Sequence, residues 1–337
     1  GGYRRTAFYC PDLAGEGRCN MSALREAMQH YLSLRRSLGF KLINVESTLR
    51  SFVAFAEREA ASHVTTDLAL RWVKLSTAKE PATLADRLNT VRRFAIWRSA
   101  ADERTEVPPK NLLPYRYYRK PPYIYSDEEI EELVRAARRL PSPKGLRGLS
   151  YATLFGLLAA TGMRISEAVC LDRENIDLEE KMLSIRESKF RKSRLVPVHM
   201  TTRDALSAYA EKRDRIFPML QSVAFFVSER GTRVTQWAAR DNFAVVSRQI
   251  GIRKKIKGKR VGRGPRLHDM RHRFAAQTLV DWYRAGINVE REIHKLSTYL
   301  GHAHVNDTYW YLEAVPELLE LATQKLMQEK KEAGDDD

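Results

Sequence analysis

The segment from Glu106 to Tyr125 limits the fold more than any other part of the chain, because it contains five prolines and five tyrosines. Proline lacks a backbone N–H and has a fixed φ, so neither a helix nor a central strand can pass through such a segment. The chain of 337 residues is long enough to form a hydrophobic core on each side of it. We therefore predict two domains joined by a linker at residues 106–125.

Upstream of the linker, apolar residues recur at helical spacing, which predicts a helical domain at residues 21–105 after an extension of residues 1–20. The expected helices span roughly residues 21–38, 44–61, 66–75 and 81–100. Arginines occupy their polar faces, and Arg87, Arg92 and Arg93 are candidates for contacts to phosphate groups. A solvated surface is the alternative for each of these arginines taken singly.

Downstream, Ser126 and Glu129 form the pattern of a capping box, which predicts that a second domain, residues 126–325, begins with a helix reaching toward Pro141. A short acidic tail at residues 326–337 follows this domain. Further helices are expected at residues 149–161, 236–250, 268–285, 290–299 and 313–330, and strands at residues 181–186, 194–198 and 225–227. The predicted fold class is therefore mainly α with a small β-sheet.

Charge is distributed unevenly along the chain. The sequence has 58 Lys and Arg residues against 42 Asp and Glu, a formal net charge of +16, yet residues 301–337 carry three basic and nine acidic side chains. The densest basic run, residues 253–273, has ten Lys or Arg and one acidic residue, Asp269. Such a field attracts polyanions, of which nucleic acid is the commonest, and a solvated basic face is the alternative.

Cysteine, glycine and apolar patterns exclude several other classes. The three cysteines have no CxxC spacing, which favours neither a disulfide framework nor a zinc site and suits a reducing compartment. No glycine-rich phosphate loop occurs, and the longest apolar run, residues 149–161, is too short to span a bilayer. Because no His, Cys, Asp or Glu cluster has metal-ligand spacing, we predict neither a metal nor another cofactor.

A few residues have positions that suggest chemistry. Arg164 follows an apolar helix and a tight turn, where a charge requires a partner or an anionic ligand, and Glu167 is a candidate partner. His268 and Arg271 are three residues apart, hence on one helix face, within the basic run. His302 follows Gly301 at the end of another apolar segment. Each of these features taken alone is also compatible with an ordinary helix surface.

Taken together, the motifs resemble the catalytic domain of the tyrosine recombinases, or phage-type integrases. The strings that carry the resemblance are TGMRISEAVCLDRENIDLEE, SKFRKSRLVPV, LHDMRHRFA and LGHAHVNDTYWYL, in this order. The family pattern is an Arg in an [ST]-G-x-R-x-[ST]-E turn, a hairpin Lys, His-x-x-Arg, Leu-Gly-His, and a Tyr nine residues after that last His. The resemblance extends from near Ser126 to near Lys325, and residues 21–100 are more loosely similar to the family's helical core-binding domain.

The resemblance implies that a tyrosine attacks a DNA phosphodiester, forms a 3′-phosphotyrosyl bond and is later displaced when the strand is rejoined. The catalytic set that it implies is Arg164, Lys189, His268, Arg271, His302 and Tyr311. The two arginines and His302 would stabilise charge on the non-bridging oxygens of the transition state. Lys189 resembles the acid that protonates the leaving 5′-oxygen, and His268 the residue that positions or deprotonates the nucleophile.

Two of these assignments have rivals in the sequence. Tyr309 and Tyr311 are two residues apart, so on a helix they point about 200° away from each other, and the family interval of nine residues selects Tyr311. Lys192 shares a turn with Lys189, and the family's G-K-G-x-K-x-R hairpin places Lys189 at the catalytic lysine although glycines are missing here. Lys192 and Arg266 remain candidates for DNA contact.

The resemblance also implies partners. These are double-stranded DNA at a specific recombination site and three further copies of this chain in a homotetramer on two duplexes, alone or with other recombinases of the same element. The apolar stripe after Tyr311, at positions 312–326, would dock into a neighbouring subunit, with packing on its own core as the alternative.

The end of the sequence looks most like recombinases of bacterial mobile elements, which implies an integrase or transposase that acts in the cytoplasm and on the nucleoid when bound to DNA. Two alternatives remain open. One is a non-catalytic DNA-binding accessory or regulatory protein with the same fold, and the other is an enzyme like the type IB topoisomerases.

Overall fold

The computed structural model describes residues 22–78, 80–115, 121–186, 193–254 and 264–332, with side chains of residues 313, 314 and 325 onward left out. The chain forms two compact units, Gly1–Arg119 and Lys120–Asp337. Their division falls inside the proline-rich segment, where regular structure cannot continue. Among the residues that the structure describes, none of the helices is long and apolar enough to cross a membrane.

The first unit consists of helices at the four places where periodicity predicts them. These are α1 (Ala23–Ser37), α2 (Ile43–Arg58), α3 (Thr66–Lys74) and α4 (Pro81–Ser99). Ser22 and Thr65 cap α1 and α3 by accepting hydrogen bonds from backbone N–H groups, and α4 begins with a proline. Aromatic residues such as Phe52 and Phe94 are fully buried between the helices, so this unit has a core of its own.

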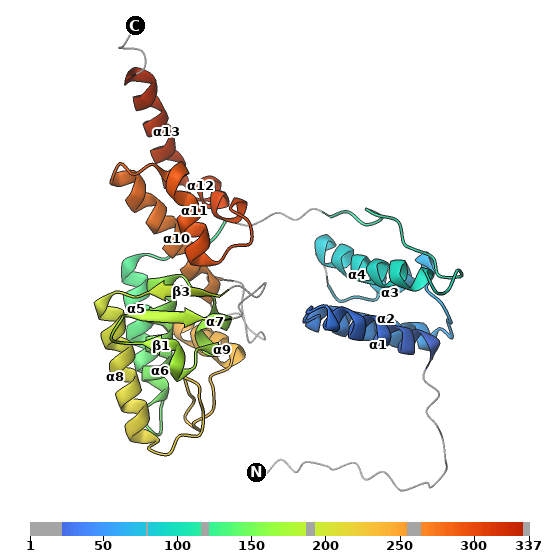
Figure 1. The fold of residues 1–337 in the computed structure, drawn as a ribbon, viewed down its shortest axis with the longest axis horizontal. Helices are drawn as coiled ribbons and strands as arrows, with labels where there is room; N and C mark the ends of the chain where they lie inside the picture. The colour runs from blue at the N-terminus through green and yellow to red at the C-terminus, as the bar shows by residue number, and fades with distance from the viewer. Residues whose placement is uncertain (1–21, 79, 116–120, 187–192, 255–263, 333–337) are drawn as a thin grey trace. The chain divides into compact units, whose positions relative to one another are not determined.

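The second unit contains the remaining elements (Figure 1). They are α5 (Asp127–Arg138), α6 (Arg147–Thr161), α7 (Ile165–Cys170), a 3-10 turn (Arg173–Asn175), β1 (Ile176–Asp177), β2 (Met182–Ile185), β3 (Arg194–Pro197), α8 (Met200–Ile216), α9 (Gln236–Gln249), α10 (Leu267–Arg284), α11 (Val289–Leu300), α12 (Asn306–Ala314) and α13 (Pro316–Glu332). The strands form an antiparallel sheet in the order β1-β2-β3, with Leu183 opposite Val196. The predicted capping box of Ser126 and Glu129 starts α5.

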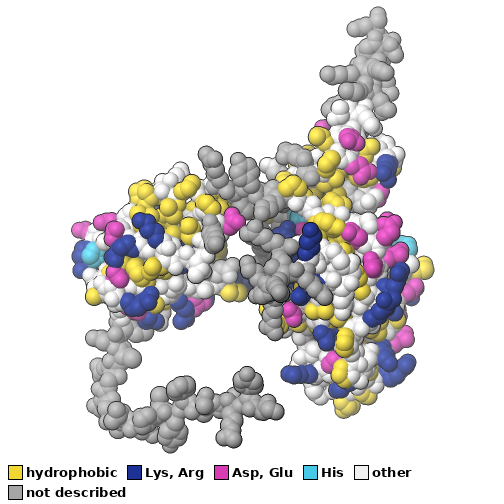
Figure 2. Space-filling view, turned by 180° about the vertical axis from the view of Figure 1, so that it is seen from behind, with side chains coloured by type: hydrophobic (Ala, Val, Ile, Leu, Met, Phe, Trp, Pro, Cys, Tyr) yellow, Lys and Arg dark blue, Asp and Glu magenta, His cyan; other side chains and the backbone are white. Residues whose placement is uncertain are grey.

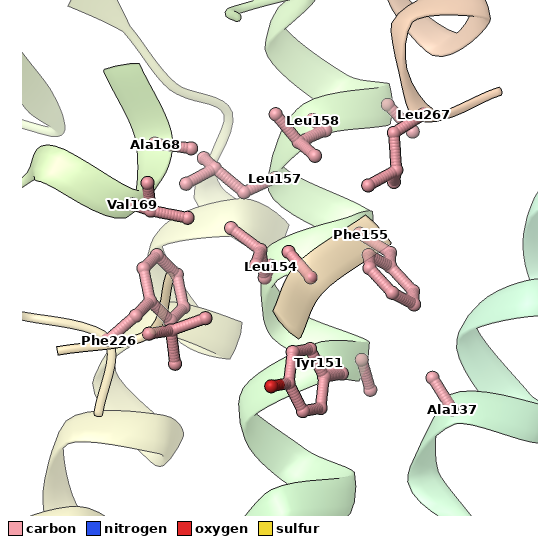
Figure 3. Packing of buried hydrophobic residues seen from close by; sticks show 14 of the residues in the cluster. Ala137, Tyr151, Leu154, Phe155, Leu157, Leu158, Ala168, Val169, Phe226 and Leu267 are labelled. Carbon is pink, nitrogen blue, oxygen red and sulfur yellow. The ribbon is translucent and has the colours of Figure 1, made fainter. Parts of the chain in front are cut away.

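Helix α6 forms the centre of this unit. It is apolar around most of its circumference, so it must be buried on nearly all sides. In Figure 3, Leu154, Phe155 and Leu158 of α6 lie among side chains from the neighbouring elements, including Val169 of α7 and Phe226. A second core cluster joins α10, α11, α12 and the start of α13, which lie together at one end of the unit (Figure 1).

Sequence reasoning misjudged several elements of this unit. Residues 225–227 form no strand: the chain there has only isolated bridges, from Asp172 to Ala224 and from Val227 to Arg233. These apolar residues fill the core from a loop, where Val227 donates its N–H to the Tyr209 hydroxyl. Helix α8 was not predicted, because Leu206, Tyr209 and Arg213 are its buried residues and leave little apolar periodicity.

The predicted helix at residues 313–330 is confirmed as α13, which begins at Pro316, and a shorter helix that was not predicted, α12, precedes it. The residue before a proline is forced toward extended backbone, and Val315 has φ −117° and ψ 109° ahead of Pro316. Helix α12 therefore ends at Ala314, and α13 begins as a separate helix at Pro316. This break turns the segment that carries Tyr311 into a separate short helix.

The described part of the apolar stripe packs on its own subunit, which is the alternative to docking in a neighbour. Val315 and Leu318 are buried against α10 and α12, and Glu317 accepts a hydrogen bond from Arg284. Leu319 is exposed, and the distal part of α13 projects away from the unit (Figure 1). Docking of positions 312–326 in a neighbour stays a prediction, and within this chain the first buried residues of the stripe pack on their own unit.

Candidate active site

The site is built on the ends of two helices. Helix α6 ends at Gly162, with φ 58°, and α11 ends at Gly301, with φ 67°. Both residues are in the left-handed region, which glycine adopts without steric cost. The last carbonyl groups of a helix have no partner within the helix, so they are available to donors from elsewhere in the fold.

Arginine side chains occupy these carbonyl groups. Arg271 of α10 donates from Nη1 to the oxygen of Gly162 at 2.9 Å and from Nη2 to that of Leu300 at 2.7 Å, so one guanidinium joins both helix ends. Arg164 donates from Nη2 to the oxygen of Gly301 at 2.9 Å. The two arginines predicted by the motifs are thus fixed beside each other by the backbone.

Glu167 holds a third arginine next to them. Its carboxylate accepts from Arg164 at 2.8 Å, which confirms the predicted partnership, and from two nitrogens of Arg194 of β3 at 2.8 and 3.1 Å. Burial would raise the pKa of Glu167, but the hydrogen bonds and charge of Arg194, with those of Arg164, outweigh burial and hold this pKa below its ordinary value. Glu167 is therefore a carboxylate at neutral pH.

The arginines outnumber the acidic groups at this site. Burial, and then the charge of Arg164, lower the pKa of Arg271 to about 10, so Arg271 still carries its proton at neutral pH. Two guanidiniums thus pair with the carboxylate of Glu167, and that of Arg271 lies close enough to be affected by its charge. An excess of fixed positive charge with planar donor groups suits an anion with several oxygens, such as a phosphodiester.

The predicted histidines border the same place. Surrounding protein and then the charge of Arg271 lower the pKa of His268 to about 4, which makes this side chain a neutral imidazole at pH 7. His302 contacts the Thr308 hydroxyl through Nδ1 at 2.7 Å, and its ring stacks at 6.4 Å from that of Tyr311. A neutral imidazole can still donate a hydrogen bond to a phosphate oxygen.

The two candidate tyrosines lie on opposite sides of α12, as their spacing predicts. Tyr311 is 1% exposed, whereas Tyr309 is 39% exposed. The Tyr311 hydroxyl lies 3.0 Å from Nδ1 of His272, and an ionised Tyr311 would raise the pKa of the nearby Arg271. Tyr311 is therefore the tyrosine that faces the arginine cluster.

The structure thus brings together five residues of the predicted catalytic set, namely Arg164, His268, Arg271, His302 and Tyr311. Lys189 and its rival Lys192 lie outside the described residues.

Sequence reasoning missed Arg194 and His272. Arg194 had a usable signal, because strand alternation places it on the same face as the buried Val196. His272 had none beyond its position directly after Arg271, since its contact with Tyr311 depends on how α10 packs against α12.

The candidate DNA-contact residues have varied surroundings. Arg87 stacks over the Trp72 ring at 4.2 Å, and burial lowers its pKa, so part of its role is packing. Arg92 is half-buried and Arg93 is exposed. Arg266 directly precedes α10 as its N-cap residue and donates to Asp269 at 3.0 Å. Their contacts with DNA remain predictions.

Basic side chains gather in several groups on the surface, interspersed with acidic ones (Figure 2). Within the described ranges, no group of three or more His, Cys, Asp or Glu side chains is arranged to hold a metal ion. The expected lack of a cofactor stays a prediction.

Comparison with known proteins assigns the chain to a family. The profile of the Phage integrase family matches residues 124–317. The chain is 44% identical over 310 residues to y4rB of Sinorhizobium fredii, named as an integrase/recombinase, which covers 91% of this chain and 98% of that protein. It is 25% identical over 287 residues to the tyrosine recombinase XerD of Lacticaseibacillus casei, over 84% and 90% of the two chains. The chain belongs to the phage integrase family: it is a tyrosine recombinase, an enzyme that breaks and rejoins DNA strands.

Solved structures share its fold. XerH recombinase bound to its difH substrate after cleavage matches with a TM-score of 0.60 and 17% identity, over 90% of this chain and 84% of that one. The Tn1549 transposon integrase in complex with transposon right end DNA matches with a TM-score of 0.58 and 15% identity, over 90% and 98%. These matches confirm the predicted fold class, mainly α with a small β-sheet and a recombinase catalytic domain.

Proposed function

We propose that this protein is a site-specific recombinase of a bacterial mobile element, an integrase or transposase, which cuts DNA through a 3′-phosphotyrosyl intermediate. One observation carries the proposal: a buried tyrosine, Tyr311, lies beside a cluster of arginines, two of which share the carboxylate of Glu167. A phosphodiester that enters this cluster would present its phosphorus to the phenolic oxygen.

Each group in the site has a part in this reaction. The guanidiniums of Arg164 and Arg271 donate to the non-bridging oxygens, where negative charge grows in the transition state. They need no reorganisation, because backbone carbonyls already hold both of them. His302 adds a donor, and Lys189 supplies the proton for the leaving 5′-oxygen.

The similar proteins support two parts of the proposal: the origin of the enzyme in a mobile element, and its partners, DNA and further subunits. The similar protein y4rB is named as an integrase/recombinase, and the Tn1549 integrase is a transposon protein solved with transposon end DNA. A lambda integrase of similar fold was solved as a tetramer on a Holliday junction, with a TM-score of 0.50. We infer the same kind of partners here: double-stranded DNA at a specific site and three further copies of this chain. The protein would then act on the nucleoid of a bacterium.

A non-catalytic accessory protein of the same fold would have no need for Tyr311 and both arginines in one site. A topoisomerase-like enzyme would need them, but would relax supercoiled plasmids of any sequence. Relaxation of an arbitrary plasmid at a rate equal to cleavage of a selected site would therefore favour the topoisomerase.

Covalent capture tests the proposed function and selects the DNA site in the same experiment. Nicked duplexes of random sequence are incubated with the protein. Strands that stay attached to the protein in detergent are covalently bound, and these strands are amplified and enriched. Tyr311→Phe removes the nucleophilic oxygen, so this variant should capture no DNA from the enriched pool. Tyr309→Phe is the matched control, because Tyr309 lies on the same helix with its side chain exposed, and it should capture DNA like the wild type. The reverse result would overturn the assignment.

A further inference from the structure

The hydroxyl of Tyr311 has a histidine beside it, and this histidine is not one of the predicted catalytic residues. Nδ1 of His272 lies 3.0 Å from the Tyr311 oxygen, and both side chains are buried. With Nδ1 unprotonated, the tyrosine hydroxyl donates its hydrogen bond to the imidazole. This is the geometry that a general base needs toward a nucleophile before attack.

A buried carboxylate stands on the other side of the same imidazole. Oδ1 of Asp269 lies 3.9 Å from Nε2 of His272, one turn earlier on α10. This distance is too long for a hydrogen bond but short enough for the carboxylate to stabilise a protonated imidazole. Asp269 is itself fixed, because its two oxygens accept from the backbone N–H of Arg266 at 2.7 Å and from its guanidinium at 3.0 Å.

The other groups around His272 do not replace it. The His268 ring lies edge-on to the His272 ring at 4.8 Å, and the rings of Trp310 and Tyr311 of α12 each lie 5.5 Å from it. His268, whose pKa is lowered to about 4, accepts a proton less readily than an ordinary imidazole does. His302 stacks on Tyr311 and contacts Thr308 through Nδ1, while Arg271 donates to backbone carbonyls.

We infer that His272 is a catalytic residue of this enzyme, the base that takes the proton of Tyr311, and that Asp269 is its positioning residue. The inference rests on the proposed phosphotyrosyl chemistry. As the bond from the Tyr311 oxygen to phosphorus forms, the phenolic proton passes to Nδ1 of His272. The bond from phosphorus to the 5′-oxygen breaks, and that oxygen keeps the electron pair and takes a proton from the general acid, for which Lys189 is the candidate. In rejoining, His272 returns its proton to the tyrosine.

A pair of duplexes separates this role from that of the leaving-group acid. Both carry the sequence enriched by covalent capture, and one has sulfur in place of the bridging 5′-oxygen, because a thiolate leaves without a proton. His272→Gln should slow formation of the covalent adduct about 100-fold or more with both duplexes, since general-base catalysis contributes that much. A variant that lacks the leaving-group acid should instead regain its rate with the sulfur duplex.

The pH profile tests Asp269. The wild-type rate should rise with pH and level off as the base loses its proton. Asp269→Asn should lower the plateau and move the rising limb to lower pH. The carboxylate of the wild type stabilises the protonated imidazole, so its removal lowers the pKa of His272. A merely structural role of Asp269 would leave the limb where it is. If circular dichroism shows that His272→Gln does not fold, the pH profile of Asp269→Asn tests the proposal by itself.

The outcomes distinguish the two proposals. If the wild type captures no duplex at all, the proposed function fails. If the wild type forms the adduct and His272→Gln forms it as fast or faster with the oxygen duplex, the contact only holds Tyr311 at rest, and the catalytic role of His272 is wrong. The same conclusion follows if the sulfur duplex restores the rate of His272→Gln.

Discussion

Glu167 shows how much of this site depends on a single side chain. It is buried between Arg164 and Arg194, and both guanidiniums would lose their counter-charge without it. Removal of one partner from a buried ion pair leaves an uncompensated charge in a medium of low polarity. Glu167 therefore links the stability of the fold to the position of the arginines.

We predict that Glu167→Gln lowers the free energy of unfolding at pH 7 by about 3 kcal/mol, measured by denaturant titration. The pKa of Glu167 is depressed in the folded protein, so its stabilisation is complete above the ordinary value of 4.5 and is lost as the pH falls through the depressed pKa. The difference in unfolding free energy between wild type and variant should shrink in that acid range.

The matched control is Glu131→Gln, which removes an exposed pair with Arg135. This change should cost less than about 1 kcal/mol at pH 7, because exposed pairs contribute little. An equal loss in both variants, or a Glu167→Gln difference that stays constant down to low pH, would contradict the role of Glu167.

Single residues also mark the limits of sequence reasoning. Arg164, Arg271 and Tyr311 could be predicted because their spacing along the chain carries the information. The partners that fix the arginines could not, since Gly162, Leu300 and Gly301 contribute backbone carbonyls that have no side-chain signature. The contact between His272 and Tyr311 was hidden for another reason, because it depends on the packing of two helices.

The helix ends are the elements on which the site depends most. Local rules place them well: a glycine ends α6 and another ends α11, and the proline at 316 separates α12 from α13. Tertiary contacts decide the structure of other segments. Residues 225–227 have the sequence pattern of a strand, but they fill the core from a loop. Periodicity alone cannot distinguish these two fates of a short apolar run.

We predict that Gly301→Ala impairs catalysis more than its cost in stability explains. An added Cβ would lie 2.9 Å from Nη1 of Arg194, so this guanidinium must shift beside that of Arg164, which the Cβ meets at an ordinary contact distance of 3.6 Å. Because small displacements of catalytic groups are costly, the rate of covalent adduct formation should fall about tenfold or more. The rate is measured in a single turnover with the enriched duplex.

Gly286→Ala is the control for this substitution. Gly286 has φ 68°, close to the φ of 67° at Gly301, and an added Cβ there meets nothing within 4 Å. Both variants should lose about 1–2 kcal/mol of unfolding free energy through backbone strain, and Gly286→Ala should keep its adduct rate. Equal adduct rates in the two variants would show that the contact of Gly301 with the arginines is unimportant.

At the scale of the whole molecule, the division into two units follows from the proline-rich segment, and the C-terminal helix raises the question of assembly. Leu318 of α13 is buried in its own unit, while the distal part of the helix projects from it (Figure 1). The sequence predicts one apolar stripe, whereas the structure shows that its first part is already used within the subunit.

We predict that truncation after Gln324 leaves the unfolding free energy within about 0.5 kcal/mol of the wild type but reduces tetramer formation on paired duplexes, as measured by mass photometry. Leu318→Ala should do the opposite: it should cost about 2–5 kcal/mol of stability and leave tetramers of the folded protein intact. Tetramers that form equally well after truncation would show that α13 serves its own subunit alone.

The backbone carbonyl groups that hold the arginines affect how the sequences of such enzymes can change. Arg164, Arg194 and Arg271 all donate to main-chain oxygens at the ends of α6 and α11. A point mutation replaces a side chain and leaves the carbonyl in place, so none of these acceptors can be deleted by one codon change. The surfaces that choose a DNA sequence are therefore free to diverge in related enzymes, or to be redesigned, while the anion site keeps its shape.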